Sequence, residues 1–223
     1  MVTAMASGSR PFRLLAPLML VSLAALAGCP DPQGAFDDFS KRYDKINGGS
    51  SSSGAGGAMA CTAPAAGMAD GDWLFSLSAK LSPKKAVAFK MAVTTTDAGG
   101  GALKMGRKAT PLSNMDQMTP VGPEVDLGMF DVAADGNFDA DLGTLTITGD
   151  ANPITPGSDI VATASIHGSL CSQDPEFVCG TVDGQVMMPI MYNLMGSSFT
   201  MQKIDGGTIP APVIDCAKTP AMY

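Results

Sequence analysis

From Trp73 onward, hydrophobic and polar positions alternate along the chain with a period of two, which is typical of half-buried β-strands. Residues 82–85 have turn chemistry, and Asp135-Gly136 is a strong signal for a hairpin turn. The pattern predicts roughly eight to ten short strands. They fall at residues 73–78, 87–94, 103–108, 129–133, 138–142, 145–148, 160–170, 177–188 and 198–204.

Many short strands in one domain must hide their edges, either by closing into a barrel or by doubling into a sandwich. We therefore expect an all-β domain over residues 61–223, either an antiparallel β-barrel or a β-sandwich. Gly71-Asp72-Trp73 resembles the Gly-x-Trp start of lipocalin-type (calycin) barrels, which implies that the indole of Trp73 closes one end. Because aromatic residues are few, we expect small to medium inward side chains, which would leave a barrel room for one apolar ligand.

The start of the chain has the pattern of an export signal. Arg10 and Arg13 precede an apolar run, residues 14–26, that is shorter than the roughly 20 residues of a membrane-spanning helix. The run ends in Leu26-Ala27-Gly28-Cys29, which resembles the bacterial lipobox. This resemblance implies that residues 1–28 are a signal peptide and that Cys29 carries acyl chains such as palmitate. Because Pro30 rather than Asp follows the cysteine, we expect an outer-membrane location in the cell envelope.

Residues 29–60 are expected to join this anchor to the folded domain. Phe36, Phe39, Tyr43 and Ile46 recur at roughly helical spacing and predict a short amphipathic helix. Residues 48–58 are almost entirely Gly, Ser and Ala, a composition typical of a flexible tether. The domain organisation that we predict is therefore a signal peptide (1–28), an anchor and tether (29–60) and a β domain (61–223).

The charge of the chain limits its partners. Loss of residues 1–28 removes Arg10 and Arg13 but no acid, which changes the formal charge from −7 to −9. An acidic chain without a basic stripe is unsuited to nucleic acid, so the expected partners are a membrane through Cys29, a small apolar ligand or an envelope protein. The main basic cluster either neutralises acids elsewhere in the fold or binds an anion locally; it consists of Lys80, Lys84, Lys85 and Lys90.

Four cysteines remain for the exported domain, and this even number predicts two disulfide bonds. Three pairings are possible. We favour Cys171 with Cys179, because the strands beside them have the pattern of a hairpin, and Cys61 with Cys216, which would join the two ends of the domain.

Metal and cofactor chemistry have little support in the sequence. Asp135, Asn137, Asp139 and Asp141 match the first ligand positions of a calcium loop, but the bidentate acid of such loops is missing, so we expect no metal there. A second cluster consists of four methionines: Met187, Met188, Met191 and Met195. Their soft thioethers suit Cu(I), but we favour a packing role for them. We expect no cofactor.

An enzymatic role would have to use the single histidine, His167, which the alternation places on a strand. No Gly-x-Ser-x-Gly motif accompanies it. We therefore expect a non-enzymatic binding or envelope-interaction domain, with a lipocalin-like carrier of an apolar ligand and an exported hydrolase as the alternatives.

Overall fold

The computed structural model describes residues 61–223, which form nine strands and one short 3-10 helix. The elements are β1 (Gly71–Ser78), β2 (Val87–Gly99), β3 (Ala102–Pro111), β4 (Val125–Val132), β5 (Asn137–Ile147), η1 (Gly149–Ala151), β6 (Ile160–Ser169), β7 (Phe177–Met188), β8 (Tyr192–Asn193) and β9 (Ser197–Lys203). The predicted strands at 138–142 and 145–148 are one strand, β5.

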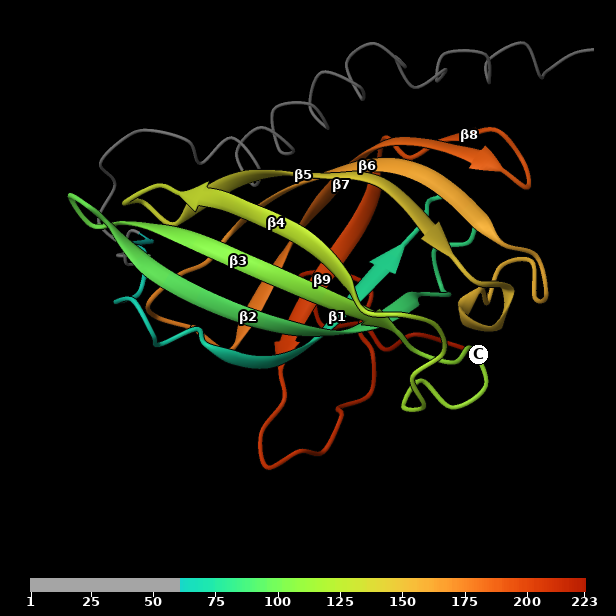
Figure 1. Cartoon of the computed structure of the whole chain (residues 1–223), viewed down its shortest axis with the longest axis horizontal. Helices are drawn as coiled ribbons and strands as arrows, with labels where there is room; N and C mark the ends of the chain where they lie inside the picture. The colour runs from blue at the N-terminus through green and yellow to red at the C-terminus, as the bar shows by residue number, and fades with distance from the viewer. Residues whose placement is uncertain (1–60) are drawn as a thin grey trace, which may run out of the picture. The chain divides into compact units, whose positions relative to one another are not determined.

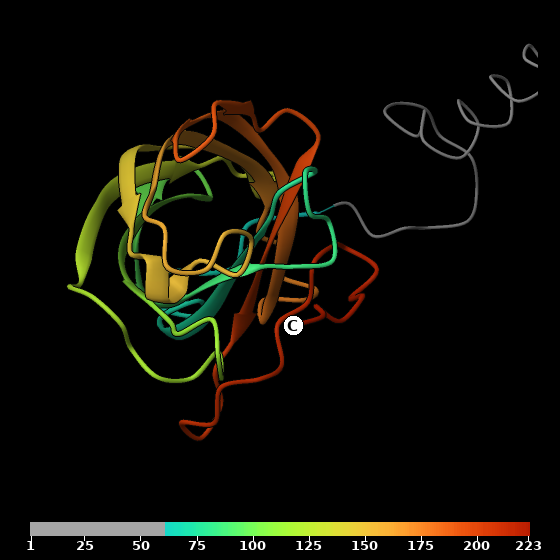
Figure 2. The same cartoon turned by 90° about the vertical axis from the view of Figure 1, so that its right-hand side faces the viewer.

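The strands close into a barrel (Figure 1). β1 to β7 pair in sequence order, and β9 pairs with both β7 and β1, so that eight strands form a ring (Figure 2). The two-residue β8 adds to β7 outside this ring. All neighbouring strands are antiparallel, which confirms the predicted all-β antiparallel barrel and excludes the sandwich.

The two ends of the barrel differ. We call the end at which β1 begins the Trp73 end; Trp73 is 0% exposed there, and its Nε1 donates a hydrogen bond to the Ala69 carbonyl at 2.9 Å. The other end holds the loops at 79–86, 112–124, 148–159 and 189–196. We call it the methionine end; it lies on the right in Figure 1 and faces the viewer in Figure 2.

Large aromatic side chains fill the interior. Phe75 lies between Phe89 and Phe199, with ring centroids 5.9 and 5.7 Å away, and Phe138 also contacts Phe199. The apolar cavity beside Phe75 and Phe89 has a volume of only about 30 Å³, the size of one water molecule. Most inward side chains are small to medium, as expected, but aromatic rings are concentrated inside the barrel and leave little room beside Phe75 and Phe89.

Two facing glycines make room for these rings. Gly168 on β6 pairs with Gly180 on β7, and the ring of Phe199 lies against both. A Cβ atom on Gly180 would lie 2.7 Å from Phe199 and only 2.0 Å from the His167 carbonyl oxygen. A side chain at this position would therefore force the two strands apart.

One junction of the barrel wall is barely paired. β4 and β5 share a single bridge, Val132 with Phe138, and they diverge away from their hairpin (Figure 1). We call this junction the β4–β5 seam. Each strand also carries a β-bulge at an Asp-Leu-Gly tripeptide, where the glycine has a positive φ and its N–H donates to the aspartate. The bulged residues lie at Asp126-Leu127-Gly128 and Asp141-Leu142-Gly143.

The two disulfides confirm that all four cysteines are bonded, but the favoured pairing was wrong. Cys61 is joined to Cys171, and Cys179 to Cys216. In the register of β6 and β7 the partner of Cys179 is Ser169, so Cys171 lies beyond the hairpin, in the loop that also contacts Thr62.

The second disulfide holds a C-terminal segment, residues 204–223, against the outside of the barrel. Ser198 and Thr200 on β9 donate hydrogen bonds to carbonyl groups of this segment. Leu74 on β1 is 0% exposed although it points outward, and it packs against Ile204 in a small second cluster. The C-terminal segment thus explains why β1 is buried on both faces.

Several predictions lie outside the described residues: the signal peptide, lipidation of Cys29, the amphipathic helix at 36–46 and the tether at 48–58. Among residues 61–223, no helix combines the length and the apolar character needed to cross a membrane.

Candidate functional site

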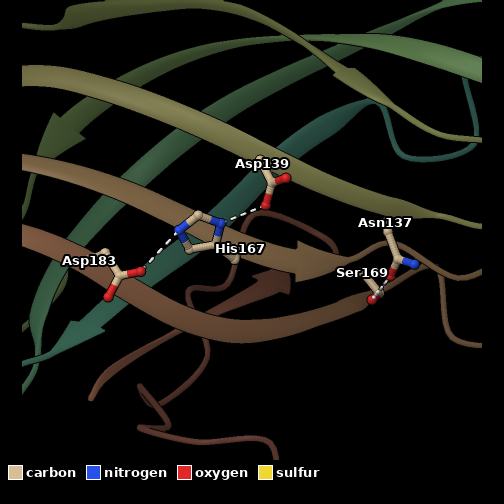
Figure 3. Close-up of polar contacts among 5 residues, drawn as sticks. All are labelled: Asn137, Asp139, His167, Ser169 and Asp183. Carbon is tan, nitrogen blue, oxygen red and sulfur yellow. Dashed lines mark hydrogen bonds and ion pairs between the residues drawn. The ribbon is translucent and has the colours of Figure 1, made fainter. Parts of the chain in front are cut away.

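The single histidine of the chain lies on the outer wall of the barrel between two carboxylates (Figure 3). His167 on β6 is flanked by Asp139 on β5, with Nδ1 and Oδ1 2.5 Å apart, and by Asp183 on β7, with Nε2 and Oδ2 3.3 Å apart. The strand register produces this arrangement, because Asp139 pairs directly with His167 while Asp183 lies diagonally across from it. Each of the two imidazole nitrogens therefore faces a carboxylate oxygen.

Ser169, a hydroxyl two residues along the same strand, does not complete a catalytic pair. Its Oγ donates to Asn137 Oδ1 at 2.6 Å, on the same face as His167 (Figure 3). Both imidazole nitrogens face carboxylates, so no nitrogen is positioned to take a proton from this hydroxyl. The arrangement is a polar ladder rather than a Ser-His-Asp site.

The ladder borders a wide, open hollow of about 1010 Å³ near the Trp73 end, which we call the outer hollow. Its lining comes from β2 to β7 and includes His167, Asp139 and Thr181. Lys104 and Asp131, on the opposite side, form a surface ion pair at 2.7 Å. The hollow thus presents alternating charges and hydroxyl groups to solvent, which suits a polar partner.

The four residues of the calcium-like pattern do not converge. Asp135 accepts hydrogen bonds from Asn137, Asp139 contacts His167, and Asp141 accepts the N–H of Gly143 in the β5 bulge. Within residues 61–223, no three His, Cys, Asp or Glu side chains gather as a metal site would require.

The methionine cluster lies at the surface, so the favoured packing role was wrong. Met187, Met188, Met191 and Met195 are 40%, 55%, 73% and 68% exposed. They lie along a stretch that forms the end of β7, a turn and β8.

The basic residues of the first hairpin divide between two places. Lys90 on β2 forms an ion pair with Asp72 at 2.8 Å, and Lys85 donates to the Pro153 carbonyl. Lys80, Lys84 and Lys85 lie together in the loop after β1, at the methionine end, whereas Lys90 lies on the strand. The four lysines therefore do not form one anion site.

Sequence reasoning missed Arg107, a buried cation inside the barrel. Arg107 on β3 is 2% exposed; its Nη2 donates to the Leu127 carbonyl at 3.2 Å, and its guanidinium lies 4.3 Å from the centre of the Phe130 ring. Nε and Nη1 have no hydrogen-bond partner. Burial lowers the pKa of Arg107 to about 10, although Asp141 across the seam acts in the opposite direction.

The signal for Arg107 was present in the alternation. On β3 the inward positions are Leu103, Met105, Arg107 and Ala109, so the period of two already places an arginine on the apolar face. An unpaired charge on such a face is rare enough to indicate a strained or functional position.

Together these features define a class: a closed, eight-stranded antiparallel barrel with a packed interior and a polar hollow on its outer wall. No known protein family, curated protein or solved structure matches the chain.

Proposed function

We propose that this chain is an exported lipoprotein, anchored through Cys29 in the bacterial cell envelope, whose barrel is a non-enzymatic binding module. The observation that carries the binding role is the outer hollow of about 1010 Å³, with the ladder of Asp139, His167 and Asp183 at its edge. A packed barrel supplies a rigid wall, and rigid elements hold such side chains in place for a partner. The partner that suits this lining is a polar, charged surface of another envelope molecule.

The binding role can be tested by photo-crosslinking in intact cells. A photoreactive amino acid at Thr181, which lines the outer hollow, should give a discrete adduct. The same group at Thr96, an exposed threonine on β2 that does not line the hollow, is the matched control and should give none. Asp139→Asn should weaken the Thr181 adduct. Equal labelling from both positions, or none from Thr181, would contradict the proposal.

Labelling with a clickable fatty acid tests the anchor separately. The parent chain should incorporate the label, and Cys29→Ala should lose it. The rival hydrolase is tested on ester, glycoside and peptide substrates; turnover that His167→Ala abolishes would replace the binding proposal with an enzymatic one.

A second candidate, a carrier of an amphiphilic anion, is favoured by one observation. The unpaired nitrogens of Arg107 lie in an apolar interior beside the seam at Leu127. A carboxylate could pair with this guanidinium. Because the adjacent cavity holds only about one water, an acyl chain could enter only if β4 and β5 moved apart. Calorimetric titration with oleate should then show binding that Arg107→Met abolishes, whereas no heat with the parent protein would exclude the carrier.

A further inference from the structure

The exposed apolar side chains of the domain are gathered at one end of the barrel. Thirteen large hydrophobic residues are exposed among residues 61–223, and only Met68 and Met129 lie away from the methionine end. The other eleven are Leu81, Met115, Met118, Val125, Met187, Met188, Ile190, Met191, Met195, Met222 and Tyr223. The last two belong to this end because the Met222 N–H donates to the Lys84 carbonyl at 2.7 Å.

The centre of this surface is the turn between β7 and β9. The chain carries no charged residue from 184 to 202, and within this stretch Ile190 and Met191 are 58% and 73% exposed. Ile190 and Leu81 also border a narrow apolar groove with Pro189 and Tyr192. Soluble proteins rarely expose such a set of side chains without a partner.

Lysines flank the apolar turn. A Cβ atom on Gly196 would lie 3.3 Å from the Lys80 side chain, which places the stem of this lysine against the turn that carries Met195. Lys84 lies in the same loop as Lys80. Apolar side chains at a tip with lysine ammonium groups behind them match the two layers of a bilayer surface, acyl chains and phosphate groups.

We propose that the methionine end is a membrane-docking tip that inserts Ile190 and Met191 into the surface of a lipid bilayer while Lys80 and Lys84 contact lipid phosphates. Methionine suits this task because its unbranched, flexible side chain adapts to a disordered apolar phase. Four acids, Asp116, Glu124, Asp150 and Asp159, lie in the neighbouring loops at 112–124 and 148–159, so insertion of apolar side chains, rather than net charge, supplies most of the attraction. This docking role rests on the proposed function in one respect, since the lipid on Cys29 would keep a bilayer within reach of the tip.

Vesicle flotation of the unlipidated fragment 61–223 tests the tip independently of the anchor. This fragment contains the whole closed barrel and both disulfides and belongs to one compact unit. With vesicles of phosphatidylethanolamine and a minority of phosphatidylglycerol, the parent should float with the lipid. Ile190→Ser with Met191→Ser should reduce the partition coefficient by about tenfold for each inserted side chain. The matched control, Met68→Ser with Met129→Ser, should leave it within about twofold.

A spectroscopic readout locates the inserted residue. A tryptophan in Met191→Trp should shift its emission to shorter wavelength and be quenched by brominated lipids, whereas one in Met129→Trp should respond to neither. The only native tryptophan, Trp73, is 0% exposed and contributes a constant background.

Three results would overturn the proposal. The first is a parent fragment that does not float while Cys29-dependent labelling of the full chain succeeds, which leaves the anchor intact and removes the tip. The second is flotation that persists in the double serine variant but is lost in Lys80→Gln with Lys84→Gln, which indicates adsorption by charge alone. The third is a concentration-dependent increase in mass that the serine variant removes without any vesicle binding, which identifies a second copy of the chain as the occupant.

Discussion

Replacing Arg107 by methionine should stabilise the domain, although it removes a hydrogen bond and a cation–π contact. The side chain is 2% exposed in an apolar interior, and two of its nitrogens lack partners. A buried charge of this kind disfavours folding, and apolar replacements of similar volume are often stabilising. Methionine follows the path of the arginine stem and can contact Phe130 in its place.

The lowered pKa of Arg107 gives the size of the expected change in stability. Burial lowers it from the ordinary arginine value to about 10, and a tenfold change in the proton equilibrium corresponds to about 1.4 kcal/mol, so the charged form costs about 3 kcal/mol on folding. Loss of the bond to the Leu127 carbonyl and of the contact with Phe130 offsets about 1–2 kcal/mol of this. We therefore expect a net gain of about 1–2 kcal/mol in the free energy of unfolding at pH 7.

Urea denaturation of the parent and the variant measures this gain. Lys108→Met is the matched control, because Lys108 is the next residue and forms only an exposed ion pair with Glu124 at 3.7 Å; it should change stability by less than about 0.5 kcal/mol. Between about pH 10 and 12.5 the folded parent has released the Arg107 proton while the unfolded chain still holds it. The parent therefore becomes relatively more stable as the pH rises, and the advantage of Arg107→Met should shrink. A variant that is less stable than the parent at pH 7 would refute this reasoning.

Two further predictions concern the barrel wall. Cys179→Ser with Cys216→Ser removes a disulfide that spans 37 residues and should lower the free energy of unfolding by about 4 kcal/mol on the loop-entropy model. Urea denaturation measures this loss, and an unchanged midpoint would contradict the role given to the C-terminal segment. Gly180→Ala should cost more than about 3 kcal/mol or prevent folding, because its Cβ would meet the His167 carbonyl oxygen. Gly143→Ala, which meets only open space but must adopt a φ of +63°, should cost about 1 kcal/mol, so equal losses at the two glycines would be inconsistent with close packing of β6 and β7.

The alternation of hydrophobic positions was sufficient to predict the strands and an all-β domain, because inward residues such as Phe75, Phe89 and Phe138 repeat with a period of two, but it left the choice between barrel and sandwich open. It could not predict how full the barrel is, because composition does not say that the few aromatic residues share one interior. The disulfide pairing was missed for a similar reason. It depends on the register of β6 and β7, in which Cys179 faces Ser169, and a shift of two residues would have produced a different bond.

The candidate sites were predictable only in part. Asp139 and His167 could be placed on outward faces of their strands, but their pairing required the register of β5 with β6. The methionines between 187 and 195 were assigned to packing because methionine usually fills cores, whereas the turn that carries them lies beyond the last buried layer of the barrel. Such failures of local rules are expected where a surface has a task other than folding.

The β4–β5 seam is the least paired junction of the barrel wall, and its cause can be traced to the sequence. In each strand an Asp-Leu-Gly tripeptide interrupts the alternation, since the glycine adopts a left-handed conformation that adds one residue to the strand. Continuing the pairing of Val132 with Phe138 would place Leu127 opposite Gly143, so the two bulges face each other and neither strand offers a regular edge. The backbone groups there cannot form a ladder, and Arg107 takes up one of them, the Leu127 carbonyl. The arginine is thus tied to the seam, so its replacement should abolish any oleate binding that the seam supports, while the gain in stability comes from removal of the desolvated charge.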